Sequence, residues 1–268
     1  MTSHKIQSSD GHKIAYEVIG KGEPLVLIMG LGAPGSTWEK HLLEYKKEFQ
    51  CIVIDNRGAG RSSRPIGPYS TLDMAYDTLA VVDALNLSKF HLAGLSMGGA
   101  IAQELALKIP ERLNSLLLIS TWGKCNPYTL QLFNHFCNMR SNSSPKEFMK
   151  MLQLWIFSPV SFDNEAYQKE LRESIEKSNE GYMTYDAFCS QVSACMTHDA
   201  LGKLSAISSP TLITVGEKDI FTPPSFSIDM HNCIQDSELL IFPNTGHCHH
   251  WESLDLFNKK TTEFFKNN

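Results

Sequence analysis

Three short stretches of this chain carry the side-chain types that nucleophilic catalysis requires. They are "GLSMGG" around Ser96, "GEKDIFTPP" around Asp219, and "NTGHCHHWES", where three histidines and a cysteine fill the positions from His247 to His250. A serine hydroxyl is a poor nucleophile until a histidine takes its proton and a carboxylate orients that histidine. The chain therefore has candidates for all three roles.

Ser96 lies where a strand pattern changes into a helix pattern. Residues 89–96, "KFHLAGLS", form an apolar run typical of a buried strand, and residues 98–110, "GGAIAQELALKIP", predict a helix that stops at Pro110. A strand–turn–helix elbow holds its serine in a strained backbone conformation at the end of the sheet. The flanking glycines leave room for the sharp turn, and the helix N-terminus favours developing negative charge. We expect Ser96 to be the nucleophile.

The acid is expected just beyond a later strand. Asp219 comes three residues after the apolar run 210–216. Glu217 is nearer to that run and is the weaker candidate, and its neighbour Lys218 indicates an exposed loop. We therefore expect Asp219 to orient the base.

The histidine cluster is expected to contain one working base. His247 is the first side chain beyond the Thr245–Gly246 turn that follows the apolar run 237–243. His249 and His250 lie toward the final helix, and adjacent residues at a helix start point in different directions. We expect His247 to be the base, with His249 and His250 capping that helix or partly buried at its start.

A metal site is a poor explanation for the same cluster. Metal-binding histidines usually stand four residues apart on a helix, or beside paired cysteines. The run from His247 to His250 has neither spacing, and no acidic cluster accompanies it. We expect no metal and no other cofactor.

Bulk composition narrows the function classes. The chain has 268 residues, 42% of them hydrophobic, with a formal net charge of −5 and a pI of about 6.1. This charge argues against a nucleic-acid partner, which needs a concentrated basic surface. No apolar run approaches the roughly 20 residues of a membrane-spanning helix, and the N-terminus lacks an apolar signal core. Seven scattered cysteines without a C-x-x-C pair favour free thiols in a reducing compartment. We expect a cytoplasmic protein.

The remaining pattern predicts the scaffold that positions these residues. Apolar runs and one hairpin predict eight strands, and amphipathic segments predict helices between them. The runs are the hairpin around Asp10–Gly11 and residues 24–30, 51–58, 89–96, 113–121, 210–216 and 237–243, with helices at 72–87, 98–110 and 251–268. Such alternation favours a mostly parallel sheet with helices on both faces.

One region interrupts this alternation. Residues 122–209 contain no strand-like run and are rich in helical and aromatic segments. Nearly ninety residues are too many for a connecting loop. We expect an α/β core made of residues 1–121 and 210–268, with residues 122–209 inserted as a helical cap over the strand ends.

Several motifs together resemble the capped α/β-hydrolase-fold family over essentially the whole chain. They are "MGLG", "DNRGAGRSS", "GLSMGG", "PERLNSLLLIS", "GEKDIFTPP" and "NTGHCHHWESLDLF". The resemblance implies that Ser96 is the nucleophile, Asp219 the acid and His247 the base, with the backbone N–H groups of Leu31 and Met97 as the oxyanion hole. Many members carry His-Gly where this chain has Met29-Gly30. Because the donor is a backbone group, we expect the oxyanion hole to survive this difference.

The resemblance also implies a reaction class. A serine rather than an aspartate at the elbow points to acyl chemistry, and the sequence is similar in style to small bacterial enol-lactonases and aminoacrylate hydrolases. We expect hydrolysis of a carboxylic ester or lactone of a small, partly apolar substrate, bound by cap aromatics such as Trp122, Phe133, Trp155 and Phe157. The same triad also serves perhydrolysis, carbon–carbon bond hydrolysis or acyl transfer, or survives in a ligand receptor with little turnover. The sequence does not predict an oligomeric state.

Overall fold

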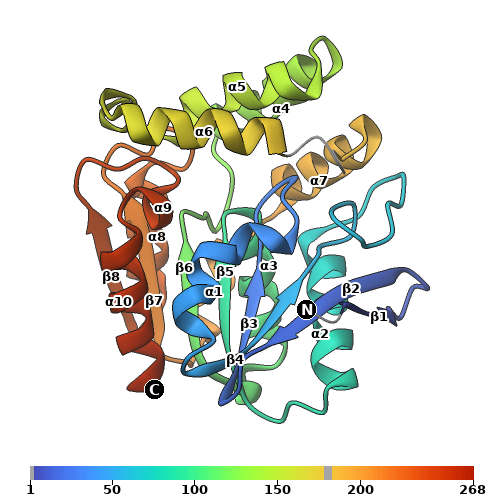
Figure 1. Ribbon diagram of the computed structural model, residues 1–268. Coiled ribbons are helices and arrows are strands. Elements are labelled where there is room, and N and C mark those ends of the chain that lie inside the picture. The colour runs from blue at the N-terminus through green and yellow to red at the C-terminus, as the bar shows by residue number, and fades with distance from the viewer. Residues whose placement is uncertain (1–2, 178–182) are drawn as a thin grey trace.

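The computed structural model describes residues 3–177 and 183–268, and its strands form one eight-stranded sheet (Figure 1). The strand order is β1-β2-β4-β3-β5-β6-β7-β8. The β1–β2 and β2–β4 pairs are antiparallel, whereas all other neighbours are parallel. The predicted mostly parallel sheet is confirmed. The strands are β1 Ser3–Gln7, β2 Lys13–Ile19, β3 Glu23–Ile28, β4 Phe49–Ile54, β5 Phe90–Leu95, β6 Leu113–Ile119, β7 Thr211–Gly216 and β8 Ser237–Phe242.

Helices cover both faces of this sheet. Side chains alternate along a strand, so Val26 and Ile28 of β3 pack on one face while Leu25 and Leu27 pack on the other. The first face is covered by α2 (Thr71–Ala84), α3 (Met97–Lys108) and α8 (Pro224–Cys233); the second by α1 (Glu39–Tyr45) and α10 (Leu254–Lys266). Ser96, Asp219 and His247 come after the carboxyl ends of β5, β7 and β8. These parallel strands end at the same edge of the sheet, so the three residues gather there.

Some predicted elements have different boundaries. The segment 251–268 was expected to be one helix, but it forms α9 (His249–Glu252) and α10, separated by Ser253 at φ −124° and ψ 46°. The strand expected over 51–58 ends at Ile54. Pro223 is the N-cap of α8, and Pro224 lies in its first turn, where its missing N–H costs nothing.

The segment between β6 and β7 is helical, as predicted. Its helices are α4 (Pro127–Ser141), α5 (Pro145–Ile156), α6 (Glu165–Lys177) and α7 (Tyr185–Thr197), and they lie across the end of the sheet (Figure 1). Residues 178–182 of the expected cap lie outside the described residues. The division into a core (1–121 and 210–268) and a cap (122–209) stays a prediction.

Short 3-10 turns complete the connections, at Gly35–Trp38, Pro110–Arg112, Pro159–Asp163 and Leu201–Ala206. None of the helices formed by residues 3–177 and 183–268 is long and apolar enough to cross a membrane.

Candidate active site

Ser96 is the single residue between β5 and α3, and its backbone is strained. Its φ of 54° and ψ of −117° lie in a region that non-glycine residues rarely adopt, at a cost of about 1–3 kcal/mol. Two hydrogen bonds hold it there: Ser96 N donates to Ile119 O at 2.8 Å, and Thr121 Oγ1 donates to Ser96 O at 2.7 Å. The expected elbow conformation is therefore present.

The glycines beside Ser96 permit close backbone contacts. A Cβ on Gly98 would lie 2.3 Å from Ile28 O, so only glycine lets α3 pass this close to the end of β3. A Cβ on Gly30 would lie 3.3 Å from Ser96 Cβ. The loop after β3 is thus held directly against Ser96.

Asp219 is buried, whereas Lys218 and Ile220 on either side of it are exposed. Its side chain accepts hydrogen bonds from Phe221 N (2.9 Å), Thr222 N (2.8 Å) and Thr222 Oγ1 (2.8 Å), and it faces His247. Glu217 is exposed and accepts a hydrogen bond from Asn244 N at 2.9 Å. The structure thus brings Asp219, and not Glu217, to His247.

His247 lies at the same edge and bonds to Asp219. His247 Nδ1 is 2.8 Å from Asp219 Oδ2 and 3.0 Å from Thr222 Oγ1. With Nδ1 facing the carboxylate, Nε2 is the nitrogen left to accept a proton. The imidazole also packs on Phe221, with ring centroids 4.7 Å apart.

Two consecutive residues after β6 connect the backbone of Ser96 to that of His247. Ser120 Oγ donates to His247 O at 2.8 Å, and Thr121 holds the carbonyl of Ser96. Among the described residues, no hydrogen bond joins Ser96 Oγ to the His247 ring. Such bonds often form only in the substrate complex. Ser96 and His247 are each only 5% exposed, so both side chains are buried at this edge of the sheet.

The other two clustered histidines lie behind the site. His249 and His250 are fully buried, not partly buried as expected, and the N-cap of α9 is Cys248. His249 Nδ1 lies 3.1 Å from Ser120 Oγ, and its Nε2 lies 3.0 Å from Thr214 Oγ1. Burial lowers the pKa of His249 to about 3 and lowers the pKa of His250 well below its usual range. Both imidazoles are therefore neutral.

The loop expected to supply an oxyanion donor is anchored on both sides of that donor. Asn56 Nδ2 donates to Met29 O at 2.8 Å, and Gly32 N donates to Gln191 Oε1 at 2.8 Å. In residues 3–177 and 183–268, the N–H groups of Leu31 and Met97 make no hydrogen bond. They remain available to an oxyanion. Met29, in the place of the histidine of many relatives, is buried in the core and contributes no polar group.

Three of the expected substrate-binding aromatics, Trp122, Phe133 and Trp155, belong to a network of rings around Phe221. Phe133 and Phe136 contact Phe221 at centroid distances of 5.5 and 5.4 Å; Trp122 packs on Phe133, and Trp155 on Phe136. Phe157 lies apart and stacks on Trp251 at 6.2 Å. Trp122 and Phe133 are fully buried, whereas Trp155 is partly exposed. A role of these aromatics in substrate binding stays a prediction.

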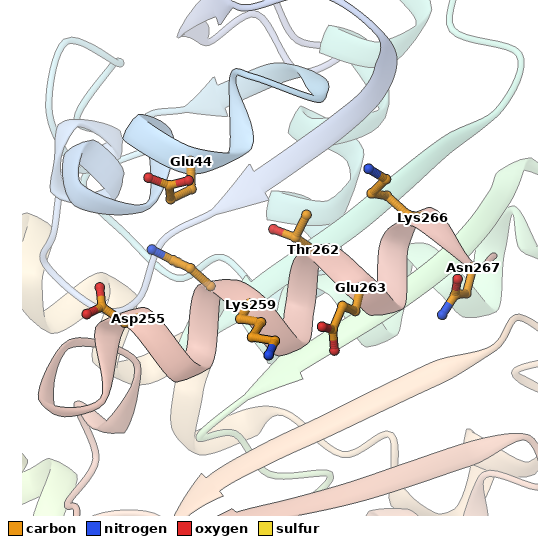
Figure 2. Close-up of a pocket in the computed structure, with 8 residues that line it drawn as sticks. Glu44, Asp255, Lys259, Thr262, Glu263, Lys266 and Asn267 are labelled. Atoms are coloured by element: carbon orange, nitrogen blue, oxygen red, sulfur yellow. The ribbon is translucent and has the colours of Figure 1, made fainter.

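A surface pocket of about 550 Å³ lies elsewhere (Figure 2). It is lined by α1 and α10 residues such as Glu44, Asp255, Lys259 and Glu263, most of them exposed and charged. None of the catalytic candidates lines it. The described part of the chain contains no group of three or more His, Cys, Asp or Glu side chains arranged to hold a metal.

Six residues of this site were missed by the sequence reasoning: Asn56, Ser120, Thr121, Gln191, Phe221 and Thr222. Thr222 and Phe221 stand within three positions of Asp219, so a closer look at that loop would have found them. Ser120 lies inside the apolar run 113–121, one residue beyond the end of β6, and its distinguishing feature is a positive φ of 44°, which the sequence does not display. Gln191 is far from every motif in the chain.

Known proteins resemble this chain in both sequence and fold. The model of a family described as "alpha/beta hydrolase fold" matches residues 23–254. A protein of Pantoea ananatis named "Putative carbamate hydrolase RutD" is 30% identical over 251 residues, covering 91% of this chain and 90% of the relative. A thermophilic esterase from Thermogutta terrifontis superposes with a TM-score of 0.86 at 26% identity, covering 100% and 99% of the two chains. The enol-lactonase from Burkholderia xenovorans LB400 gives 0.86 at 20% identity, covering 99% and 100%, which shows a common fold.

Proposed function

Because the chain belongs to the alpha/beta hydrolase fold family, we propose that it is a serine hydrolase that cleaves a carboxylic ester or lactone through an acyl-enzyme. The observation that carries this proposal is the buried Asp219–His247 pair, 2.8 Å apart, at the same sheet edge as the strained Ser96. A buried carboxylate aimed at Nδ1 fixes the tautomer in which Nε2 accepts a proton. In this proposal residues 1–121 and 210–268 are the core and 122–209 the cap.

The reaction follows from these positions. Ser96 Oγ attacks the carbonyl carbon while His247 Nε2 takes the hydroxyl proton, and Asp219 stabilises the imidazolium. The N–H groups of Leu31 and Met97 bind the oxyanion, and each such donor contributes about 3–4 kcal/mol to the transition state. His247 then protonates the leaving alcohol. A water deprotonated by His247 releases the acid and restores Ser96.

The substrate class is inferred from the lining and from the relatives. Phe221 on the His247 ring, with Phe133 and Phe136 behind it, supports a small, partly apolar acyl group. A carbamate is the second candidate, because the 30% identical relative is named for that activity and a carbamate carbonyl is open to the same attack.

The test combines active-site labelling with a substrate panel. A fluorophosphonate should label wild type at Ser96 and fail to label Ser96→Ala. p-Nitrophenyl acetate and butyrate, lactones of graded ring size and an N-alkyl carbamate should then be compared by kcat/KM. Labelling that persists in Ser96→Ala would contradict the nucleophile assignment. Labelling of Ser96 without turnover of any panel member would instead favour a receptor.

A further inference from the structure

Gln191 joins the cap to the core at two backbone positions. It lies in α7 and is fully buried. Its Oε1 accepts from Gly32 N at 2.8 Å, and its Nε2 donates to Arg57 O at 2.8 Å. One side chain of the cap therefore bridges the loop after β3 and the loop after β4.

The second attachment point is itself rigid. The Arg57 guanidinium is buried and donates to both carboxylate oxygens of Asp77, at 2.6 and 2.7 Å, and its Nη1 lies 2.9 Å from Asp10. A planar, bidentate ion pair restricts the backbone that carries it. Gln191 is thus fixed at one end to a rigid loop and holds Gly32 with the other.

Gly32 directly follows Leu31, the expected oxyanion donor, so the Gln191–Gly32 bond bears on how the Leu31 N–H is oriented. The Leu31 N–H belongs to the peptide plane between Gly30 and Leu31. The preceding plane is held through Met29 O by Asn56, and the following plane is held through Gly32 N by Gln191. Because peptide units are planar and rotate only about φ and ψ, fixing both neighbours restricts the direction of the Leu31 N–H.

We propose that Gln191 is a positioning residue for the oxyanion hole, through which the cap orients the Leu31 N–H. This inference rests on the proposed serine-hydrolase function. Gln191 also occupies the Gly32 N–H, so this neighbouring donor does not compete with the Leu31 N–H for the oxyanion. The oxyanion hole is then complete only while α7 is seated on the core.

This role predicts a specific kinetic signature. A preorganised donor acts where charge develops, so its loss lowers kcat and leaves KM nearly unchanged. Complete removal of one oxyanion donor costs about 10²–10³ in kcat. Misorientation by loss of the Gln191 bond should cost about 10–100-fold, because the donor itself remains.

The experiment compares Q191M with a matched cap variant, Q153M. Gln153 is also a buried cap glutamine, and its Nε2 donates to Leu171 O of another cap helix at 3.2 Å. Three quantities are measured on the best panel ester: kcat, KM and inhibition by phenylboronic acid, whose serine adduct carries a tetrahedral anion. Hydrogen exchange of residues 29–34 reports directly on the Gly32 N–H.

For Q191M we expect kcat to fall about 10–100-fold and boronate affinity to fall in parallel, with KM within about threefold. Exchange over 29–34 should rise, while Q153M should stay near wild type in all four readouts. Q191A removes the same two hydrogen bonds with a smaller side chain, so it should lose kcat as Q191M does, and it serves if Q191M does not fold. Equal kcat in Q191M and Q153M, or a rise in KM alone, would overturn the inference. Ser96→Ala is assayed alongside: if it retains wild-type activity, the proposed function fails whatever Gln191 does.

Discussion

Acid should destabilise this protein, most strongly through three of its buried histidines. Burial is the largest cause that lowers the pKa of His41 to about 4, of His249 to about 3, and of His250 well below its usual range. An unfolded histidine has a pKa of about 6.5. Because the folded values are lowered, the stability is fully present above about pH 6.5 and is lost as the pH falls toward the folded values.

The size of the effect follows from proton uptake by the unfolded chain. Each histidine that titrates only after unfolding costs about 1.4 kcal/mol per pH unit below its unfolded pKa. At pH 5.5 all three folded imidazoles are still neutral. The loss between pH 8.0 and 5.5 is then about 4 kcal/mol for the three together, against a typical total stability of about 5–15 kcal/mol.

Two variants separate the pH-dependent loss of stability from the cost of changing a buried side chain. In the described part of the chain neither ring nitrogen of His250 has a hydrogen-bond partner, whereas His249 bonds to Ser120 and Thr214. H250L and H249L should each reduce the pH-dependent loss by about a third, since each removes one titrating group. Only H249L should be less stable at pH 8.0, by about 1–3 kcal/mol, because it deprives buried hydroxyls of a partner.

Urea unfolding of wild type, H250L and H249L at pH 8.0 and 5.5 measures these differences in the free energy of unfolding. A wild type equally stable at both pH values would refute the reasoning. So would an H250L variant whose loss between the two pH values equals that of wild type.

Three further outcomes are expected. Asp219→Asn should lower kcat by about 10⁴ while the urea midpoint stays close to wild type; near-normal turnover would move the orienting role elsewhere. His247→Ala should lower kcat/KM at least about a thousandfold and His250→Ala less than about tenfold; the reverse order would mean that the turn after β8 has been misread. Dialysis against EDTA should leave ester hydrolysis unchanged, and activity lost with a stoichiometric metal would contradict the metal-free mechanism.

Local signals in the sequence predicted the sheet and the strand ends at which Ser96 and His247 lie. Ser96 is flanked by a strand pattern and a helix pattern, and His247 follows a turn after an apolar run, so short-range periodicity was enough for both. The break between α9 and α10 was missed because Ser253, which separates them, is no strong helix breaker.

Long-range polar contacts were beyond the same reasoning. Gln191 lies 159 positions from Gly32, and a glutamine in an amphipathic helix looks the same whether it faces water or a loop. Ser120 has a left-handed backbone, and its hydrogen bonds join the end of β6 to His247 after β8 and to Thr222 after β7. Such residues become visible only when the tertiary contacts are known.

The hydroxyl groups of Ser120 and Thr121 hold the backbone of His247 and Ser96 from the end of β6, whereas the loop after β3 is held by a side chain of α7. No cap residue takes part in the two bonds made by these hydroxyl groups. The Gly32 N–H, by contrast, is bonded to the cap. An engineer who grafts a foreign segment in place of residues 122–209 should therefore obtain a chimera that keeps the bonds of Ser120 and Thr121 but turns esters over slowly. Restoring a glutamine opposite Gly32 is then the first change to make.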